Sequence, residues 1–126
     1  MDLKSVSGLT FFVRDVAKSA KFYEALGFKI EKQEKAYLLV RLNWFTMDFV
    51  DEGTEAEDGP KGAGLCVNIS VGDVDEFYKK ALAKGLKPAG EPRDYPEWGV
   101  RNFVINDPDG YNLVIFKRGK PRNAAE

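Results

Sequence analysis

The chain contains the segment Val13-Arg14-Asp15-Val16 and, 58 residues further on, the closely similar segment Val71-Gly72-Asp73-Val74. An apolar, strand-like run precedes each segment, and a stretch rich in alanine and lysine follows it. A glycine stands twelve residues after each aspartate, Gly27 in the first half and Gly85 in the second. The repetition indicates that the chain is an internal duplication of one strand-helix unit.

The stretch after each aspartate has the pattern of an amphipathic helix. Aspartate suits the N-cap of a helix and glycine suits its C-terminal end. In the first half, Val16, Ala20, Tyr23 and Leu26 recur at helical spacing and predict one buried face. An insertion over residues 88–98 carries three prolines and two aromatic residues and is predicted to lie outside the strands. Strands are predicted over residues 28–32, 36–42, 45–50, 101–106 and 112–117.

The duplication also predicts how the chain is organised. We expect a single domain over residues 1–126, made of modules at about 5–52 and 63–118, a linker at 53–62 and a flexible tail at 119–126. One helix covers one face of a small sheet and leaves the other face bare. Two modules must therefore combine to complete a core or a cavity, so the pattern predicts a cleft.

Composition excludes several classes of function. Nineteen basic and twenty acidic residues give a net charge of −1, which argues against nucleic acid and anionic membranes as partners. A single cysteine excludes an intrachain disulfide, and the start of the chain has no signal-peptide pattern, so a cytoplasmic protein is expected. The chain has no histidine, the commonest metal ligand and the usual acid or base near neutral pH.

Strand alternation assigns the faces of the predicted sheets. In residues 66–71, Val67 and Ile69 would face the helix, which leaves Cys66, Asn68 and Ser70 on the opposite side. Such a face is either a solvated outer surface or, if two of them curve together, the lining of a small-molecule pocket. The same parity turns to the bare side residues Gly8, Thr10, Phe12, Thr46, Asp48, Asn112 and Val114.

These features together resemble the vicinal oxygen chelate superfamily of glyoxalases, extradiol dioxygenases and bleomycin resistance proteins. The resemblance rests on Asp15, Ser19, Phe22-Tyr23 and Leu26-Gly27-Phe28 in the first half and on Asp107-Pro108-Asp109-Gly110-Tyr111 in the second. It implies an α+β fold of two βαβββ modules, which form a curved mixed sheet around a cleft with the helices on its convex side. It also implies a homodimer.

Metal-dependent members of the superfamily take ligands from four strand positions, which correspond here to Gly8, Asp48, Cys66 and Val114. Glycine and valine have no donor side chain, so we expect no metal and no other cofactor. Asp48 is then either a base of raised pKa or a hydrogen-bonding group. Cys66 is either a nucleophile or an inert thiol, and no residue is predicted to be catalytic.

The relatives without metal ligands bind drugs, and an aromatic loop at Tyr95-Pro96-Glu97-Trp98-Gly99 resembles them further. Trp98 is expected either to stack on a planar ligand, with Arg101 pairing to a carboxylate or carbonyl, or to pack in a dimer seam or the core. Parity makes Trp44 exposed, with Phe45 turned to the core. The predicted ligand-binding residues are Trp98, Arg101, Asp48, Asn68, Cys66, Phe12, Trp44 and Asn112.

Three functions are consistent with these features. The first is a metal-free, non-enzymatic protein that sequesters a planar aromatic or antibiotic-like molecule in a cleft of a homodimer. The second is a glyoxalase-like lyase or isomerase, or a dioxygenase, with a divergent site. The third is a regulatory module in which the cleft is vestigial.

Overall fold

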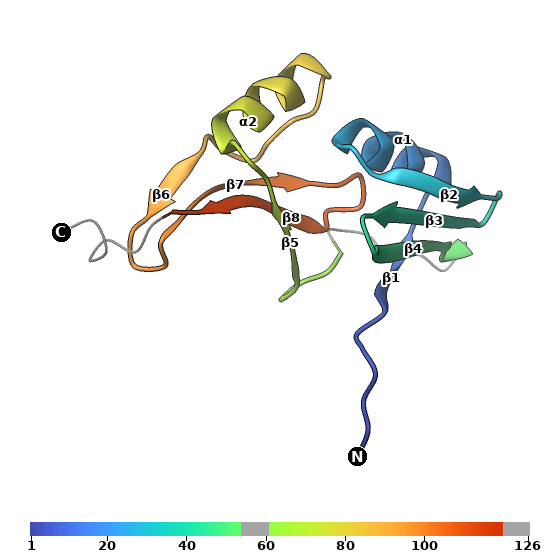
Figure 1. Ribbon diagram of the computed structural model, residues 1–126. Coiled ribbons are helices and arrows are strands. Elements are labelled where there is room, and N and C mark those ends of the chain that lie inside the picture. Colours follow the sequence, from blue (N-terminus) through green and yellow to red (C-terminus); the bar gives the residue numbers. More distant parts are fainter. Residues whose placement is uncertain (54–60, 120–126) are drawn as a thin grey trace. The chain divides into compact units, whose positions relative to one another are not determined.

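The computed structural model describes residues 1–53 and 61–119, so most of the predicted linker and tail lies outside the described residues. The chain divides into two compact units, unit 1 (Met1–Asp58) and unit 2 (Gly59–Glu126). In its described residues, each unit contains one helix and four strands, which Figure 1 labels. Unit 1 has β1 (Gly8–Val13), α1 (Val16–Leu26), β2 (Lys29–Gln33), β3 (Tyr37–Leu42) and β4 (Phe45–Asp51). Unit 2 has β5 (Cys66–Ser70), α2 (Val74–Ala83), β6 (Arg93–Tyr95), β7 (Val100–Asn106) and β8 (Asn112–Arg118).

The sheet of unit 1 has the strand order β1-β4-β3-β2. β1 and β4 run parallel, whereas β3 is antiparallel to both of its neighbours. Asp15 caps α1 as predicted, because its carboxylate accepts a hydrogen bond from the Lys18 backbone N–H at 3.1 Å. The helix ends at Gly27, which has a φ of 121°. Residues other than glycine rarely adopt this backbone conformation.

The core of unit 1 lies between α1 and its sheet. Tyr23 from the helix packs on Phe49 of β4 with ring centroids 4.6 Å apart, and Phe49 stacks on Phe11 of β1 at 5.0 Å. All three rings are almost completely buried, as are Leu38 and Val40 of β3. The strand alternation inferred from the sequence therefore assigns the buried face of this unit correctly.

Unit 2 repeats this arrangement with the order β5-β8-β7-β6 and a parallel β5–β8 pair. The registers also correspond, since Gly8 pairs with Thr46 in unit 1 as Cys66 pairs with Asn112 in unit 2. Asp73 caps α2 through a hydrogen bond from the Glu76 backbone N–H. The duplication is confirmed at the level of individual strand pairs.

The fold class is α+β as predicted, with two four-stranded mixed sheets and one helix in each unit. The predicted cleft and its curvature remain predictions. The insertion at 88–98 was expected to contain no strand, but Arg93 pairs with Asn102 and Tyr95 with Val100 to form β6. The prolines do not prevent this pairing, because Pro92 and Pro96 flank the three residues of this edge strand and do not interrupt it. Within the described residues, no helix is long and apolar enough to cross a membrane.

Gly8 is required where β1 meets β4. A Cβ built on Gly8 would lie 2.6 Å from the carbonyl oxygen of Thr46, so any side chain must displace backbone. We expect Gly8→Ala to lower the free energy of unfolding by about 1–3 kcal/mol. Gly90→Ala is the matched control, because its Cβ would meet no atom within 4 Å. Urea denaturation of both variants tests this, and equal stabilities would contradict the close approach.

Candidate ligand-binding site

The face of the unit 1 sheet opposite α1 carries a hydrogen-bonded group of three side chains from three strands. Asp48 of β4 accepts a hydrogen bond from the Thr10 hydroxyl of β1 at 2.5 Å and another from the Tyr37 hydroxyl of β3 at 2.9 Å. The two bonds use different carboxylate oxygens. Thr10 is the register partner of Asp48, so the strand pairing itself brings these two residues together.

The hydrogen bond to Asp48 raises the pKa of Tyr37, and desolvation and the negative charge of Asp48 add to this effect. The phenol therefore keeps its proton and donates to the carboxylate at any pH near neutrality. Asp48 is thus held in place by two neutral hydroxyl groups. This arrangement gives Asp48 the hydrogen-bonding role that was one of its two predicted alternatives.

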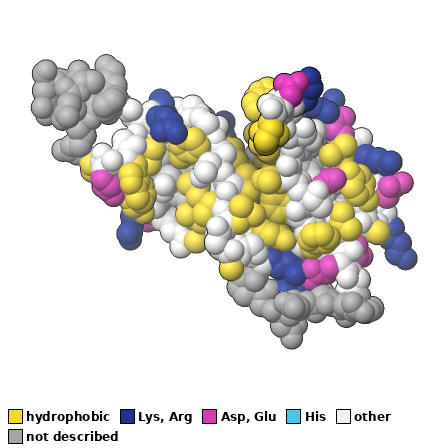
Figure 2. Space-filling view, turned by 90° about the horizontal axis from the view of Figure 1, so that it is seen from below, with side chains coloured by type: hydrophobic (Ala, Val, Ile, Leu, Met, Phe, Trp, Pro, Cys, Tyr) yellow, Lys and Arg dark blue, Asp and Glu magenta, His cyan; other side chains and the backbone are white. Residues whose placement is uncertain are grey.

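Apolar side chains surround this polar group. Phe12 of β1 is 55% exposed, and its register partner Val50 is half-buried. Leu39 pairs directly with Asp48 from the other side and is also half-buried. Figure 2 views the molecule from below the view of Figure 1 and shows hydrophobic side chains gathered on this surface. The open face of unit 1 therefore combines an apolar surface with one hydrogen-bonded carboxylate.

Trp44 lies at the tip of the β3–β4 hairpin and is 80% exposed, whereas Phe45 is half-buried. Asn43 beside it has φ 55°, as a two-residue hairpin turn requires. The two rings meet edge to face at 6.0 Å. The exposure predicted for Trp44 from strand parity is therefore what the structure shows.

The open face of unit 2 is uncharged along β5 and the neighbouring part of β8. Cys66 and Asn68 are exposed, and they pair with Asn112 and Val114. Asn112 accepts a hydrogen bond from the side-chain amide of Asn106 at 2.5 Å. Cys66, Asn68 and Asn112 thus share one face, as predicted.

The four positions that correspond to metal ligands in the superfamily do not fit a metal. The register turns Gly8, Asp48, Cys66 and Val114 to the open faces of their sheets, but two of them have no donor atom. The close approach of Thr46 to Gly8 leaves no room for a ligand side chain there. Among residues 1–53 and 61–119, no three cysteine, aspartate or glutamate side chains lie close enough together to hold a metal ion.

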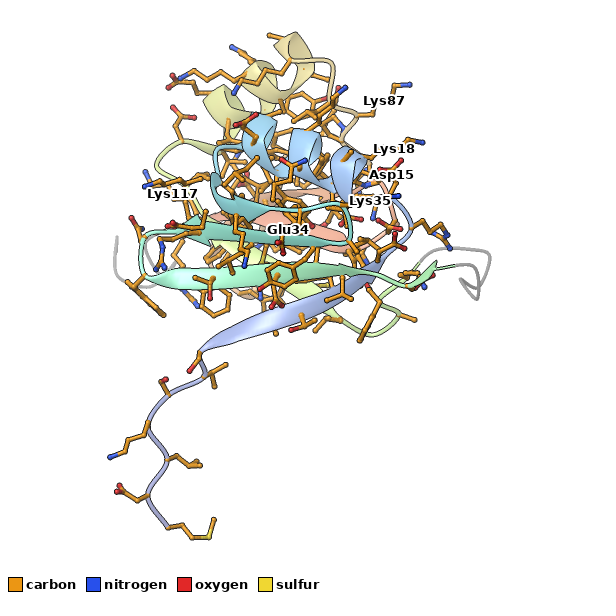
Figure 3. The ribbon with its side chains drawn as sticks, turned by 90° about the vertical axis from the view of Figure 1, so that its right-hand side faces the viewer. Asp15, Lys18, Glu34, Lys35, Lys87 and Lys117 are labelled. Carbon is orange, nitrogen blue, oxygen red and sulfur yellow. The ribbon has the colours of Figure 1, made fainter. Side chains whose placement is uncertain are left out.

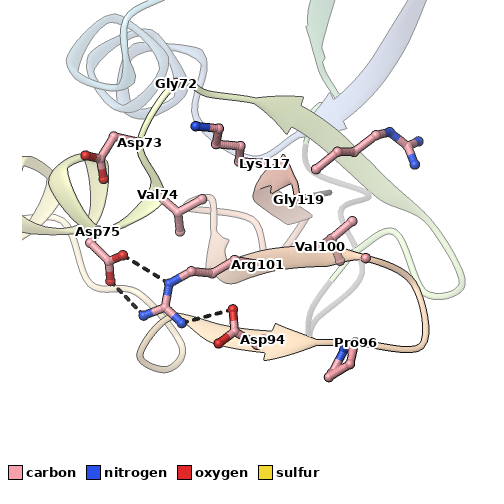
Figure 4. Close-up of a pocket in the computed structure, with 12 residues that line it drawn as sticks. Gly72, Asp73, Val74, Asp75, Asp94, Pro96, Val100, Arg101, Lys117 and Gly119 are labelled. Carbon is pink, nitrogen blue, oxygen red and sulfur yellow. Dashed lines mark hydrogen bonds and ion pairs between the residues drawn. The ribbon is translucent and has the colours of Figure 1, made fainter. Parts of the chain in front are cut away.

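Arg101 lies on the other side of its sheet from Asn68 and Asn112. Its guanidinium donates two hydrogen bonds to the Asp75 carboxylate of α2, at 2.8 and 3.0 Å, and forms an ion pair with Asp94 of β6 at 3.3 Å (Figure 4). The structure therefore does not bring Arg101 together with the predicted residues of the open face. Arg101 shares strand parity with the buried Phe103 and Ile105, and this signal was present in the sequence.

The bond from Arg101 holds the pKa of the Asp75 carboxyl below its usual range, and the two carboxylates raise the pKa of Arg101. A half-open pocket of about 590 Å³ adjoins this group, between the start of α2 and the ends of β7 and β8. Its charged lining includes Lys117, the cross-strand neighbour of Arg101. Sequence reasoning missed the roles of Asp75 and Asp94, because they lie on separate elements.

Unit 1 has a hollow in the equivalent place, at the start of α1 beside the β2–β3 turn. Asp15 and Lys35 both line it and lie near one another in Figure 3. The positions equivalent to Asp75 and Arg101 are Ala17 and Ala36, which cannot form an ion pair. A hollow beside the helix start is thus present in both units, and in unit 2 the ion pairs of Arg101 lie beside it.

Trp98 lies in the β6–β7 connection, where its ring stacks on Tyr95 with centroids 5.6 Å apart and an interplanar angle of 20°. It is 68% exposed, so it does not close the core. Its two other predicted roles, stacking on a ligand and packing in a dimer seam, remain predictions.

Comparison with known proteins agrees with this fold. The family model described as "Glyoxalase/Bleomycin resistance protein/Dioxygenase superfamily" matches residues 5–115, and the chain belongs to this superfamily. It is 28% identical over 112 residues to a bleomycin resistance protein of Klebsiella pneumoniae, covering 82% of this chain and 85% of that protein. It is 31% identical over 132 residues to a probable chloroplastic lactoylglutathione lyase of Arabidopsis thaliana, covering 94% of this chain but 37% of the lyase.

Among solved structures, a bleomycin-binding protein complexed with bleomycin matches with a TM-score of 0.65 and 23% identity. The match covers 91% of this chain and 99% of that one. This likeness shows a shared fold.

We expect the Arg101–Asp75 pair to make the stability of the protein depend on pH. Because the pKa of Asp75 is lower in the folded state, its contribution is present at neutral pH and is lost as the pH falls through that lowered value. We expect Arg101→Gln to lose less stability than the wild type when urea denaturation is repeated from pH 7 towards pH 3. Lys117→Gln, which removes the neighbouring cation, is the control and should follow the wild type. Identical acid sensitivity in all three proteins would show that the pair contributes nothing.

Proposed function

We propose that this protein binds a small molecule with an aromatic or amphipathic body, holds it without chemical change and without a metal, and acts as a homodimer. The observation that carries the proposal is that Gly8 and Val114 stand at two of the four positions that correspond to metal ligands in the superfamily. Both are ordinary paired residues of their sheets, and neither has a donor side chain. The open faces nevertheless keep apolar, hydroxyl and amide groups, which is the usual composition of a ligand-binding surface.

The names of the similar proteins support a binding role. One is called a bleomycin resistance protein and another a bleomycin-binding protein. Sequestration needs only a surface complementary to the ligand, so loss of the metal donors does not remove the function. Bleomycin is therefore the first probe to use.

An enzyme of the glyoxalase type is the second candidate, since the similarity to a probable lactoylglutathione lyase favours it. Such chemistry needs a Lewis acid or a base at the reacting atoms. Asp48 is the carboxylate in the expected place, but Thr10 and Tyr37 already hold both of its oxygens. A regulatory module with a vestigial cleft is the third candidate, and it predicts no response to small aromatic molecules.

Bleomycin should raise the melting temperature of the purified protein in proportion to the logarithm of its concentration. A ligand at 100 times its Kd stabilises the folded state by about 2.7 kcal/mol. Thermal denaturation with and without bleomycin measures the shift, and sedimentation measures whether the protein is a dimer. Metal analysis of tag-free protein is the control, and stoichiometric metal together with turnover would favour the enzyme. A flat thermal response to bleomycin and other planar antibiotics would favour the regulatory module.

Trp98→Ala should weaken binding of an aromatic ligand by about 1–3 kcal/mol if the exposed ring stacks on it. Leu82→Ala is the matched control, because Leu82 is an apolar residue of α2 that is 49% exposed. Calorimetric titration of both variants gives the affinities, and sedimentation gives the oligomeric state. Unchanged affinity with lost dimerisation would instead assign Trp98 to the seam between subunits.

A further inference from the structure

Asp48 carries a negative charge that no ion pair among residues 1–53 and 61–119 neutralises. The residue lies on β4, an interior strand of the unit 1 sheet, and its carboxylate accepts hydrogen bonds from two neutral hydroxyl groups, those of Thr10 and Tyr37. It forms no ion pair within the described parts of the chain. An interior strand holds this negative charge in a fixed position.

Two cations on the same face pair with other carboxylates, and a third, Lys29, is the register partner of Arg41 and lies two strands away from Asp48. Arg41 lies one register pair further along β3 and forms an ion pair with Glu31 at 2.6 Å. Lys32 of β2 lies in the same cross-strand row as Asp48, beyond Leu39, and pairs with Glu34 at 3.8 Å. Neither side chain supplies the missing positive charge.

The surroundings of Asp48 favour a positively charged ligand over a neutral one. Phe12, Leu39 and Val50 flank it with apolar surface. A neutral molecule laid over this surface would remove water from the carboxylate without replacing its interactions, which costs free energy. An ammonium group would both neutralise the charge and donate hydrogen bonds. A carboxylate has about four acceptor sites, of which two are used here, so it can accept two more.

We propose that Asp48, positioned by Thr10 and Tyr37, is the anchor for a singly charged amine carried on an apolar or aromatic body. This inference rests on the proposed binding function and narrows it to one class of ligand. The amine sits on the carboxylate, while the body of the ligand lies on Phe12 and its apolar neighbours. The exposed face of the Phe12 ring adds a cation–π contact.

The test compares two probes of nearly identical shape, naphthylmethylamine and naphthylmethanol, of which only the amine is charged at neutral pH. Calorimetric titration of the wild type should give about tenfold tighter binding of the amine, as a charge-assisted hydrogen bond provides. Asp48→Asn should bind the two probes equally. Glu24→Gln, which removes one negative charge from the exposed side of α1, should keep the preference.

Two further measurements do not depend on the folding of the Asp48 variant. Added sodium chloride should weaken amine binding by the wild type and leave alcohol binding unchanged, because salt screens the charge interaction. Tyr37→Phe removes one hydrogen bond but keeps the carboxylate, so it should keep a preference for the amine.

Equal binding of amine and alcohol by the wild type would overturn the inference and leave the proposed binding function standing. If Asp48→Asn binds the two probes equally but no longer forms a dimer, the inference is overturned as well. That result would assign the carboxylate to the contact between two copies of the chain. If the wild type binds neither probe, the inference fails. If bleomycin and the other planar antibiotics also give no thermal shift, the proposed function fails with it.

Discussion

Parallel pairing of the first and last strands of each unit is the constraint on which the rest of the structure depends. β1 pairs with β4, and β5 with β8, in the same direction. Parallel neighbours cannot be joined by a tight turn, so the chain must cross over the sheet, and α1 and α2 begin those crossovers. Each helix covers one face of its sheet, which leaves the other free to carry polar groups such as Asp48 and Asn68.

Sequence patterns predicted the fold well because its determinants are local. Asp15 and Asp73 are N-caps that act within one helical turn, and alternation along a single strand assigned Asp48, Cys66 and Asn112 to the open faces. The interactions that were missed join elements distant in the chain. Arg101 of β7 forms ion pairs with Asp75 of α2 and Asp94 of β6. The strand β6 forms by pairing with the edge of β7. Such partners leave no periodic signal in the sequence.

The two copies of the module have kept one backbone and diverged in charge. On the open faces, register places Val114 of unit 2 where unit 1 has Asp48. On the helix side the asymmetry is reversed, since unit 2 has the ion pairs of Arg101 where unit 1 has alanine. The buried faces tolerate no such change, because Phe11, Phe49 and Ile115 are close-packed. The two copies also differ at buried positions, but there one apolar residue replaces another, as at the equivalent positions Phe49 and Ile115.

Asp48 stands at a position that corresponds to a metal ligand in the superfamily, but its surroundings differ from those of a metal site. A metal ligand must leave lone pairs free in a geometry shared with other donors, and here Gly8 can carry no side chain and Val114 offers no donor. The hydroxyls of Thr10 and Tyr37 instead hold the carboxylate from neighbouring strands. Holding three side chains in these hydrogen bonds costs conformational entropy. An exposed aspartate that is hydrogen-bonded to water does not need such partners. The open face of unit 1 is thus organised around a fixed negative charge.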